Sequence, residues 1–130
     1  MVYKTKHLSI SINCDLPKAY QFISNPLNLP KWALGLSQSQ VKQEGVHWVA
    51  DSPMGKVHFR FVEENPYGVL DHNVTLESGE VFYNPLRVIR NGSGVEVLFS
   101  LFQLGDEDAF LSDAKMVEED LQRLKALLES

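Results

Sequence analysis

The stretch "WVADSPMGKVHFRFVEENPYGVLDHNVTL", residues 48–76, decides the fold because it contains two turns with the same chemistry. "SPMG" at 52–55 and "NPYG" at 65–68 each place Ser or Asn first, Pro second and Gly fourth, as type I turns do. Around the turns, apolar and polar side chains alternate with the period of two that is typical of half-buried strands. The stretch therefore predicts three consecutive antiparallel strands.

The two turns also predict which residues face one another across the strands. With a four-residue connection at each turn, the expected cross-strand pairs are Asp51–Lys56, Ala50–Val57, Trp48–Phe59, Phe61–His72, Phe59–Val74 and Val57–Leu76. Both turns independently bring apolar side chains onto one face of the sheet. This agreement supports the register, because a slip of one residue would move every side chain to the other face.

His72 lies on that apolar face, between Leu70 and Val74. A histidine titrates near neutral pH, so an inward imidazole can orient a ligand or transfer a proton. It can equally be a core side chain that is hydrogen-bonded to Tyr83 or to a backbone carbonyl. The sequence shows no clear second member of a catalytic pair for it.

The next turn, "ESGE" at 77–80, fits a two-residue hairpin connection. On that register, the expected cross-strand pairs are Leu76–Val81, Val74–Tyr83 and Leu70–Arg87. Tyr83 and Arg87 would then join the apolar face, where the guanidinium could bind a ligand carboxylate through two hydrogen bonds or form a structural ion pair with Glu63. Pro85 interrupts this strand and indicates an edge or a bulge, and a bulge would reverse the faces of the later residues.

The two ends of the chain complete the pattern. A half-buried strand is predicted at the start by the alternation of Leu8, Ile10, Ile12 and Cys14. Two short helices follow, in 15–24 and around 26–35. A long amphipathic helix that begins near Asp106 is predicted by apolar residues at spacings of three and four, namely Phe110, Ala114, Val117, Leu121, Leu124 and Leu128. The fold class is therefore α+β.

Composition limits the class of protein. The 130 residues suit one domain, 1–130, and 44% hydrophobic with 22% charged residues is typical of a globular protein. A net charge of −5 argues against binding to nucleic acid or anionic membranes, and no apolar run reaches transmembrane length. The lone Cys14 cannot form an internal disulfide, which favours a cytoplasmic protein. We expect no metal and no cofactor.

The chain resembles the START-like or SRPBCC superfamily, which includes polyketide cyclases and birch-pollen-allergen-like proteins. The resemblance is carried by "FISNPLNLPKW" (22–32), the "W…SPMGKV" hairpin (48–57), "GVLDHNVT" (68–75), "LRVIRNGSG" (86–94) and "EEDLQRLKALLE" (118–129). It implies a helix-grip fold, in which a curved antiparallel sheet of six to seven strands wraps around the C-terminal helix. It also implies an apolar cavity between the two, without implying a single activity.

The candidate cavity wall combines apolar and aromatic residues with a few polar groups, as ligand pockets do. Its predicted members are Trp48, Phe59, Phe61, Leu70, His72, Val74, Tyr83 and Arg87. The residues alone do not separate an open cavity from a filled core, and the family resemblance favours the cavity. Trp32, after two prolines, either lines the entrance or anchors a short helix to the sheet.

Three functions follow from this wall. The first is binding of an apolar small molecule, lipid-like or polyketide-like, whose polar end His72, Tyr83 and Arg87 would orient. The second is an enzyme of the polyketide cyclase or dehydratase type in which His72 transfers a proton to or from an activated carbonyl substrate. The third is a dimeric protein-interaction module, a homodimer, suggested by Leu98 and Phe102 on a strand that has no polar face.

Overall fold

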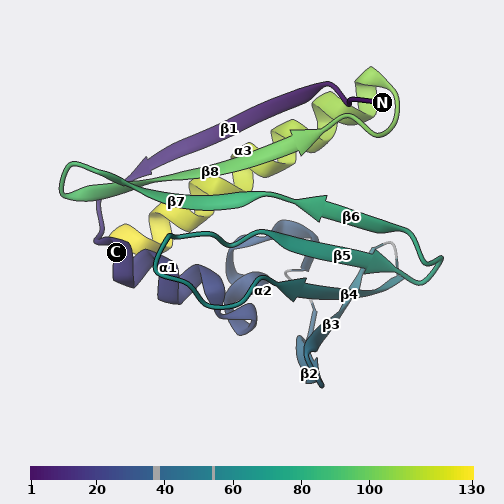
Figure 1. Ribbon diagram of the computed structural model, residues 1–130, viewed down its shortest axis with the longest axis horizontal. Helices are drawn as coiled ribbons and strands as arrows, with labels where there is room; N and C mark the ends of the chain where they lie inside the picture. Colours follow the sequence, from purple (N-terminus) through teal and green to yellow (C-terminus); the bar gives the residue numbers. More distant parts are fainter. Residues whose placement is uncertain (37–38, 54) are drawn as a thin grey trace.

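Two antiparallel sheets and a long C-terminal helix form the framework of the computed structural model, which describes residues 1–36, 39–53 and 55–130 (Figure 1). The first sheet has the order β1 (Thr5–Ile12), β8 (Gly94–Phe102), β7 (Leu86–Asn91). The second has the order β2 (Lys42–Glu44), β3 (His47–Ser52), β4 (Gly55–Phe61), β5 (His72–Leu76), β6 (Val81–Asn84). The α+β class is confirmed.

The prediction of one sheet with six to seven strands was wrong in detail, because the described residues form eight strands in two sheets. The boundary lies at Pro85, which has no N–H to donate and separates β6 from β7 (Figure 1). The Pro85 carbonyl instead accepts a hydrogen bond from the Ser100 N–H at 3.1 Å. An isolated bridge between Val69 and Arg87 joins the segment before β5 to β7.

The register of the first two hairpins is confirmed at every predicted pair. Trp48 faces Phe59 across β3 and β4, and Phe61 faces His72 across β4 and β5. Asp51 faces Lys56 beside the first turn, in which Met54 lies outside the described residues. The chemistry of two short turns was therefore sufficient to place every side chain of β3, β4 and β5 on its correct face.

The register predicted for the third hairpin was wrong by one residue. Glu77, Ser78 and Gly79 form a three-residue loop in which the Gly79 N–H donates to the Leu76 carbonyl at 2.9 Å. Gly79 has a φ of 90°, as the last residue of such a loop requires. Tyr83 consequently pairs with Asn73 instead of Val74, and this shift moves it to the opposite face of the sheet.

Short helices follow β1 as predicted. Helix α1 (Leu16–Ser24) begins after Asp15, whose side chain accepts a hydrogen bond from the Lys18 N–H at 2.8 Å. The chain continues through the 3₁₀ turn η1 (Pro26–Asn28), the short helix α2 (Leu29–Trp32) and a second 3₁₀ turn, η2 (Leu34–Leu36). The segment from α2 to η2 packs near α3 and forms one border of the site described below.

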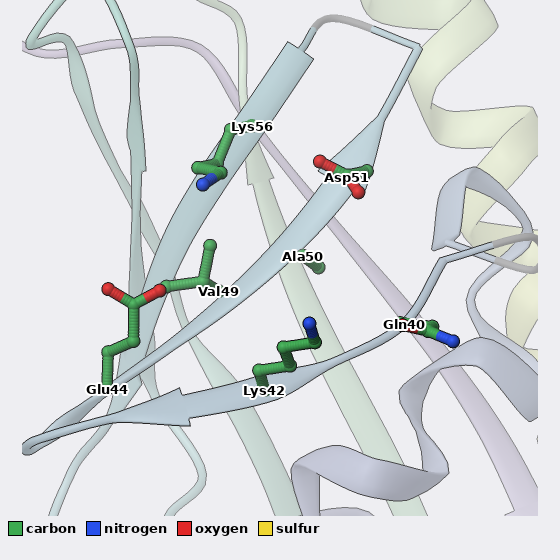
Figure 2. Close-up of a pocket in the computed structure, with 7 residues that line it drawn as sticks. All are labelled: Gln40, Lys42, Glu44, Val49, Ala50, Asp51 and Lys56. Atoms are coloured by element: carbon green, nitrogen blue, oxygen red, sulfur yellow. The ribbon is translucent and has the colours of Figure 1, made fainter.

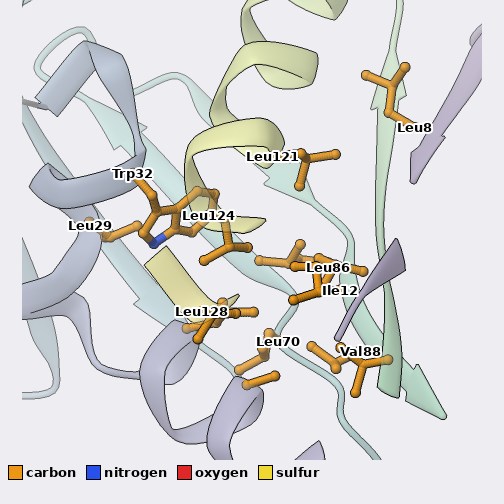
Figure 3. Packing of buried hydrophobic residues seen from close by; sticks show 14 of the residues in the cluster. Leu8, Ile12, Leu29, Trp32, Leu70, Leu86, Val88, Leu121, Leu124 and Leu128 are labelled. Atoms are coloured by element: carbon orange, nitrogen blue, oxygen red, sulfur yellow. The ribbon is translucent and has the colours of Figure 1, made fainter. Parts of the chain in front are cut away.

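Helix α3 (Glu107–Glu129) packs against β1 and β8 of the first sheet and against α2, and it closes the core (Figures 1 and 3). Asp106 caps it by accepting a hydrogen bond from the Ala109 N–H at 2.8 Å. Its buried side chains are Phe110, Ala114, Leu121, Leu124 and Leu128, as the spacing predicts. Among the helices of the described residues, none is both long and apolar enough to cross a membrane.

Candidate functional site

An apolar cavity of about 430 Å³ lies between the second sheet, the α2–η2 segment and the middle of α3. This volume is within the range of small-molecule pockets. Its lining is mostly aliphatic and aromatic, and comprises Leu29, Trp32, Ala33, Gly35, Leu36, Ser52, Pro53, Val57, Phe59, Phe61, His72, Val74, Leu86, Phe99, Asp113, Met116, Val117, Asp120 and Leu121. Of the two arrangements that the sequence allowed, an open cavity and a filled core, the structure contains the open cavity.

Four of the eight predicted wall residues line this cavity: Phe59, Phe61, His72 and Val74. Leu70 is buried in the core beside it, and Trp48 is half-buried against the same core. Tyr83 and Arg87 were placed on the wrong face. The cause is the three-residue loop before β6 together with the interruption at Pro85, which put both side chains on the outer face of the sheets.

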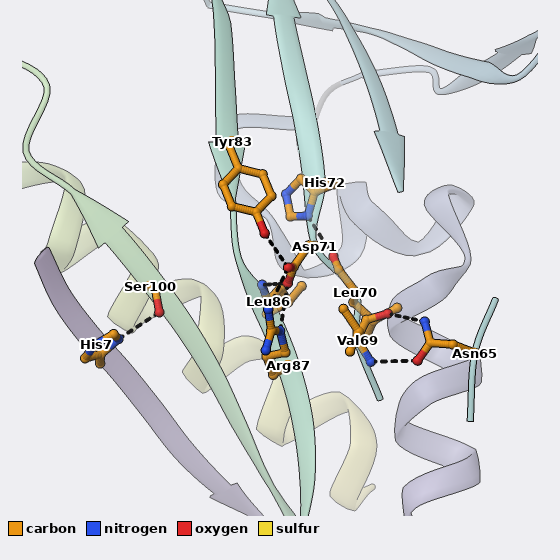
Figure 4. Close-up of polar contacts among 10 residues, drawn as sticks. All are labelled: His7, Asn65, Val69, Leu70, Asp71, His72, Tyr83, Leu86, Arg87 and Ser100. Carbon is orange, nitrogen blue, oxygen red and sulfur yellow. Dashed lines mark hydrogen bonds and ion pairs between the residues drawn. The ribbon is translucent and has the colours of Figure 1, made fainter. Parts of the chain in front are cut away.

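The hydrogen bonding of His72 defines its chemical state. Its Nδ1 lies 3.0 Å from the Leu70 carbonyl oxygen, which can only accept, so Nδ1 carries the proton (Figure 4). Burial lowers the pKa of His72 below its usual value, and the bond to the Leu70 carbonyl opposes this only in part. The imidazole is therefore neutral at pH 7, and its Nε2 presents a lone pair.

Two cavity-lining rings flank the imidazole. The centroid of the Phe61 ring lies 4.9 Å from that of His72, and the Phe99 centroid lies at 6.5 Å. These contacts help to fix the plane of the imidazole, beside its hydrogen bond to the Leu70 carbonyl. Nδ1 is the nitrogen nearer the backbone, so Nε2 lies on the side of the ring that is farther from the strand.

Sequence reasoning missed the cavity walls that lie opposite the second sheet. Ala33 and Leu36 come from the α2–η2 segment, Met116 and Val117 from α3, and Phe99 from β8. The apolar periodicity of α3 predicted that Val117 points toward the sheet. It could not predict that space remains there, because that depends on how far the helix lies from the strands. Trp32 satisfies both expectations, since it is buried and also lines the cavity.

A polar clamp holds the α2–η2 segment against α3 beside the cavity. The Asp120 carboxylate accepts a hydrogen bond from the Leu34 N–H at 3.1 Å and forms an ion pair with Arg123. Arg123 Nε in turn donates to the Trp32 carbonyl at 3.2 Å. Burial raises the pKa of Asp120, although these hydrogen bonds oppose the increase. Two side chains of one helix turn thus fix the border of the cavity.

Replacing Asp120 with alanine should loosen this border without unfolding the protein. The Leu34 N–H loses its acceptor, so its hydrogen exchange should accelerate about tenfold, as expected for the loss of one hydrogen bond to a charged group. Hydrogen exchange measured by NMR checks this. Asp113→Ala is the matched control, because Asp113 lies on the same helix and lines the same cavity. Equal exchange of Leu34 in both variants would contradict the clamp.

Tyr83 and Arg87 have a structural role on the outer face, where both bind Asp71 (Figure 4). The Asp71 carboxylate accepts hydrogen bonds from Tyr83 Oη at 2.5 Å, the Leu86 N–H at 2.9 Å, and Arg87 Nε and Nη2 at 3.0 and 2.8 Å. Burial opposes ionisation of Asp71, but these bonds outweigh it and lower its pKa to about 2. The cluster ties β5 to the start of β7 and leaves Arg87 no access to the cavity.

A smaller hollow of about 180 Å³ on β2, β3 and β4 has a different character (Figure 2). Lys42 and Lys56 line it together with Glu44 and Asp51. These opposite charges balance one another, and the side chains are exposed. The hollow therefore lacks the apolar surface that would retain an uncharged ligand, and we take the larger cavity as the candidate site.

No protein family model matches the chain, and no curated protein matches it. Solved structures do. A putative uncharacterized protein from Bacillus thuringiensis superposes with a TM-score of 0.75 at 16% identity, over 98% of this chain and 100% of that one. The Aha1 dimer from Colwellia psychrerythraea, a solution structure, gives 0.74 at 16% identity over 97% and 96% of the two chains.

A third similar structure is a putative protein of the dynemicin biosynthetic locus. It gives a TM-score of 0.74 at 10% identity over 97% of this chain, which spans 47% of that longer protein. Identities this low establish a shared fold and no shared activity. The fold is consistent with the polyketide-cyclase-like architecture that the sequence resemblance implies.

Proposed function

We propose that this chain is a START-like (SRPBCC) protein that binds an apolar small molecule, lipid-like or polyketide-like, between the second sheet and α3. The observation that carries the proposal is the cavity of about 430 Å³, whose walls are apolar except for a few polar groups. Each methylene group that a ligand buries there contributes about 0.8 kcal/mol. The cavity therefore supplies affinity mainly through apolar contact.

The border of the cavity suits the entry of such a ligand. The α2–η2 segment consists of very short helices, and the Asp120 clamp is the polar connection described above between this segment and α3. Leu29 and Trp32 of α2 are buried, but Leu34 and Gly35 of η2 are exposed, and exposed segments open at lower free energy than the core does. Entry through this border requires no opening of either sheet.

The neutral imidazole of His72 favours a second candidate, an enzyme of the polyketide cyclase or dehydratase type. The Nε2 lone pair of a neutral imidazole in a mostly apolar cavity is a suitable proton acceptor. In the described residues, however, the partner that orients the ring is the Leu70 carbonyl and not a carboxylate. If the chain turns over an activated carbonyl substrate, His72→Gln should lower kcat at least a hundredfold while KM changes little.

The homodimer remains a separate proposal, supported by the fact that the similar Colwellia protein is a dimer. Leu98 and Phe102 lie on β8, half-buried on the outer face with Arg87. Sedimentation equilibrium over a range of protein concentrations would detect such a dimer. A monomer at every concentration would count against this proposal and leave ligand binding unaffected.

Binding to the neutral dye N-phenyl-1-naphthylamine tests the proposed function. We expect one dye per chain, with Kd in the micromolar range, measured by the increase in dye fluorescence. Val117→Phe adds a ring to the cavity lining and should weaken binding at least tenfold. Leu127→Phe adds the same ring to an exposed position on the same helix and should leave binding unchanged. Absent binding, or equal binding by all three proteins, would overturn the proposal.

A further inference from the structure

The polar groups of the cavity wall are few, and most are already engaged. Asp120 binds Leu34 and Arg123, and the Ser52 hydroxyl donates to the Gly55 carbonyl at 2.8 Å. Asp113 also lines the cavity, but it is exposed on α3, so water solvates its carboxylate. His72 lines the cavity as well, and within the described part of the chain its hydrogen bond is made by Nδ1, which leaves Nε2 for a ligand.

The Trp32 indole N–H also lacks a partner within the described residues. This nitrogen is buried out of reach of water, however, so a ligand in the cavity cannot contact it without moving the ring. In Figure 3 it lies on the side of the ring toward Leu128, which does not line the cavity. Trp32 therefore offers its apolar ring to the cavity and offers no donor.

The hydrogen bond to the Leu70 carbonyl determines what Nε2 can do. Nδ1 is the donor, so Nε2 of the neutral ring can only accept. Burial lowers the pKa of His72, which keeps the ring in this state at neutral pH. A ligand group that hydrogen-bonds to Nε2 must therefore be a donor.

The charges around the cavity disfavour an anion. Its described lining residues include Asp113 and Asp120 but neither lysine nor arginine. Arg123 neutralises Asp120 from beside the cavity, and Arg87 is held by Asp71 on the other face. A ligand carboxylate would thus lose its hydration and meet no counter-charge, which is strongly unfavourable.

From these contacts we infer that the ligand's polar end is an uncharged hydrogen-bond donor, an alcohol or phenol O–H or an amide N–H, that donates to Nε2 of His72. The inference rests on the proposed function and specifies its ligand class. It excludes free fatty acids and phosphate esters as the favoured ligands. It also gives His72 a specific role, in which the imidazole accepts one hydrogen bond inside an otherwise apolar space.

Calorimetric titration with decanol, decyl methyl ether and decanoate at pH 7 tests the inference. The ether keeps the chain and the oxygen of the alcohol but has no donor, and decanoate carries a charge. Decanol should bind about tenfold more tightly than either of the other two, the difference that one hydrogen bond makes. Equal binding of decanol and the ether, or tighter binding of decanoate, would overturn the inference and leave apolar binding intact. Failure of all three to bind would overturn the proposed function as well.

Two variants test whether the imidazole causes the tighter binding of decanol than of the ether. His72→Phe keeps a ring of similar size without an acceptor, so decanol and the ether should bind it equally. His72→Gln keeps an acceptor in its amide oxygen and should retain part of the preference, which keeps the test decisive even if the phenylalanine variant folds poorly. Full preference for decanol in a folded His72→Phe protein would contradict the role of Nε2.

Discussion

Replacing Asp71 with alanine should lower the free energy of unfolding by about 3 kcal/mol, measured by denaturant titration with an unchanged m-value. Asp71 is only 4% exposed, and its carboxylate satisfies the Leu86 N–H together with Tyr83 and Arg87. The variant leaves a buried backbone donor without a partner and releases both side chains. The effect is large because one carboxylate connects the segment before β5 to β6 and β7. Its chain neighbour His72 lines the cavity.

The Asp71 carboxylate should also make the free energy of unfolding depend on pH. The folded-state pKa of Asp71 is about 2 and its ordinary value is 3.8, so ionised Asp71 stabilises the folded chain. This contribution is complete above about pH 5 and disappears as the pH falls through 3.8 toward 2. The stability difference between the wild type and Asp71→Ala should therefore shrink by about 2 kcal/mol over that interval. A difference that does not change with pH would contradict the assignment.

Arg87→Ala is the informative control for this cluster. The Arg87 side chain is 49% exposed, so its ion pair is partly screened by water and should contribute only about 1 kcal/mol. The Leu86 N–H keeps its partner in this variant. If Arg87→Ala is as destabilising as Asp71→Ala, the ion pair and not the buried backbone donor dominates, contrary to our account.

Gly68→Ala should destabilise the protein by at least about 3 kcal/mol, because two separate penalties coincide there. Gly68 has a φ of 74°, which L-residues with a side chain rarely adopt. A Cβ at this position would also lie 2.1 Å from the Val88 carbonyl oxygen, which belongs to backbone and cannot rotate away. Val88 N–H donates to the Gly68 carbonyl at 2.9 Å, so relief of the clash would break this bond.

Gly92→Ala separates the two penalties. Gly92 has a φ of 60°, yet a Cβ there would meet no atom within 4 Å. The free energy of unfolding of Gly92→Ala should therefore fall by only about 1 kcal/mol, because the backbone conformation alone opposes the substitution. Chemical denaturation of both variants measures the difference. Similar decreases in the free energy of unfolding for Gly68→Ala and Gly92→Ala would show that the close approach to Val88 does not constrain the fold.

Local turn chemistry accounts for the parts of the fold that could be predicted. The two Pro-containing turns fixed the register of β3, β4 and β5, and so placed Phe59, Phe61, His72 and Val74 on the cavity side. The third turn was ambiguous. Glu77, Ser78 and Gly79 fit a two-residue or a three-residue loop equally well by composition, and only pairing beyond the loop decides between them.

The role of Asp71 could not be read from the sequence, because it depends on three residues that become neighbours only after β6 and β7 are placed. With Tyr83 assigned to the wrong face, Asp71 was not recognised as the partner of Arg87, which was interpreted as pairing with Glu63 or binding a ligand. The residues alone could not show the cavity either, although the family resemblance favoured it. Its presence depends on the distance between α3 and the sheet, which no pattern in the sequence gives.

The central claim is that an apolar ligand lies between the second sheet and α3, and isotope-filtered NMR measures this directly. With labelled protein and unlabelled decanol, we predict intermolecular nuclear Overhauser effects from the ligand's methylene protons to Phe59, Phe61 and Val117. The proton on the hydroxyl-bearing carbon should give effects to His72. Effects confined to outer-face residues such as Tyr83, with none to Phe59 or Val117, would contradict the account.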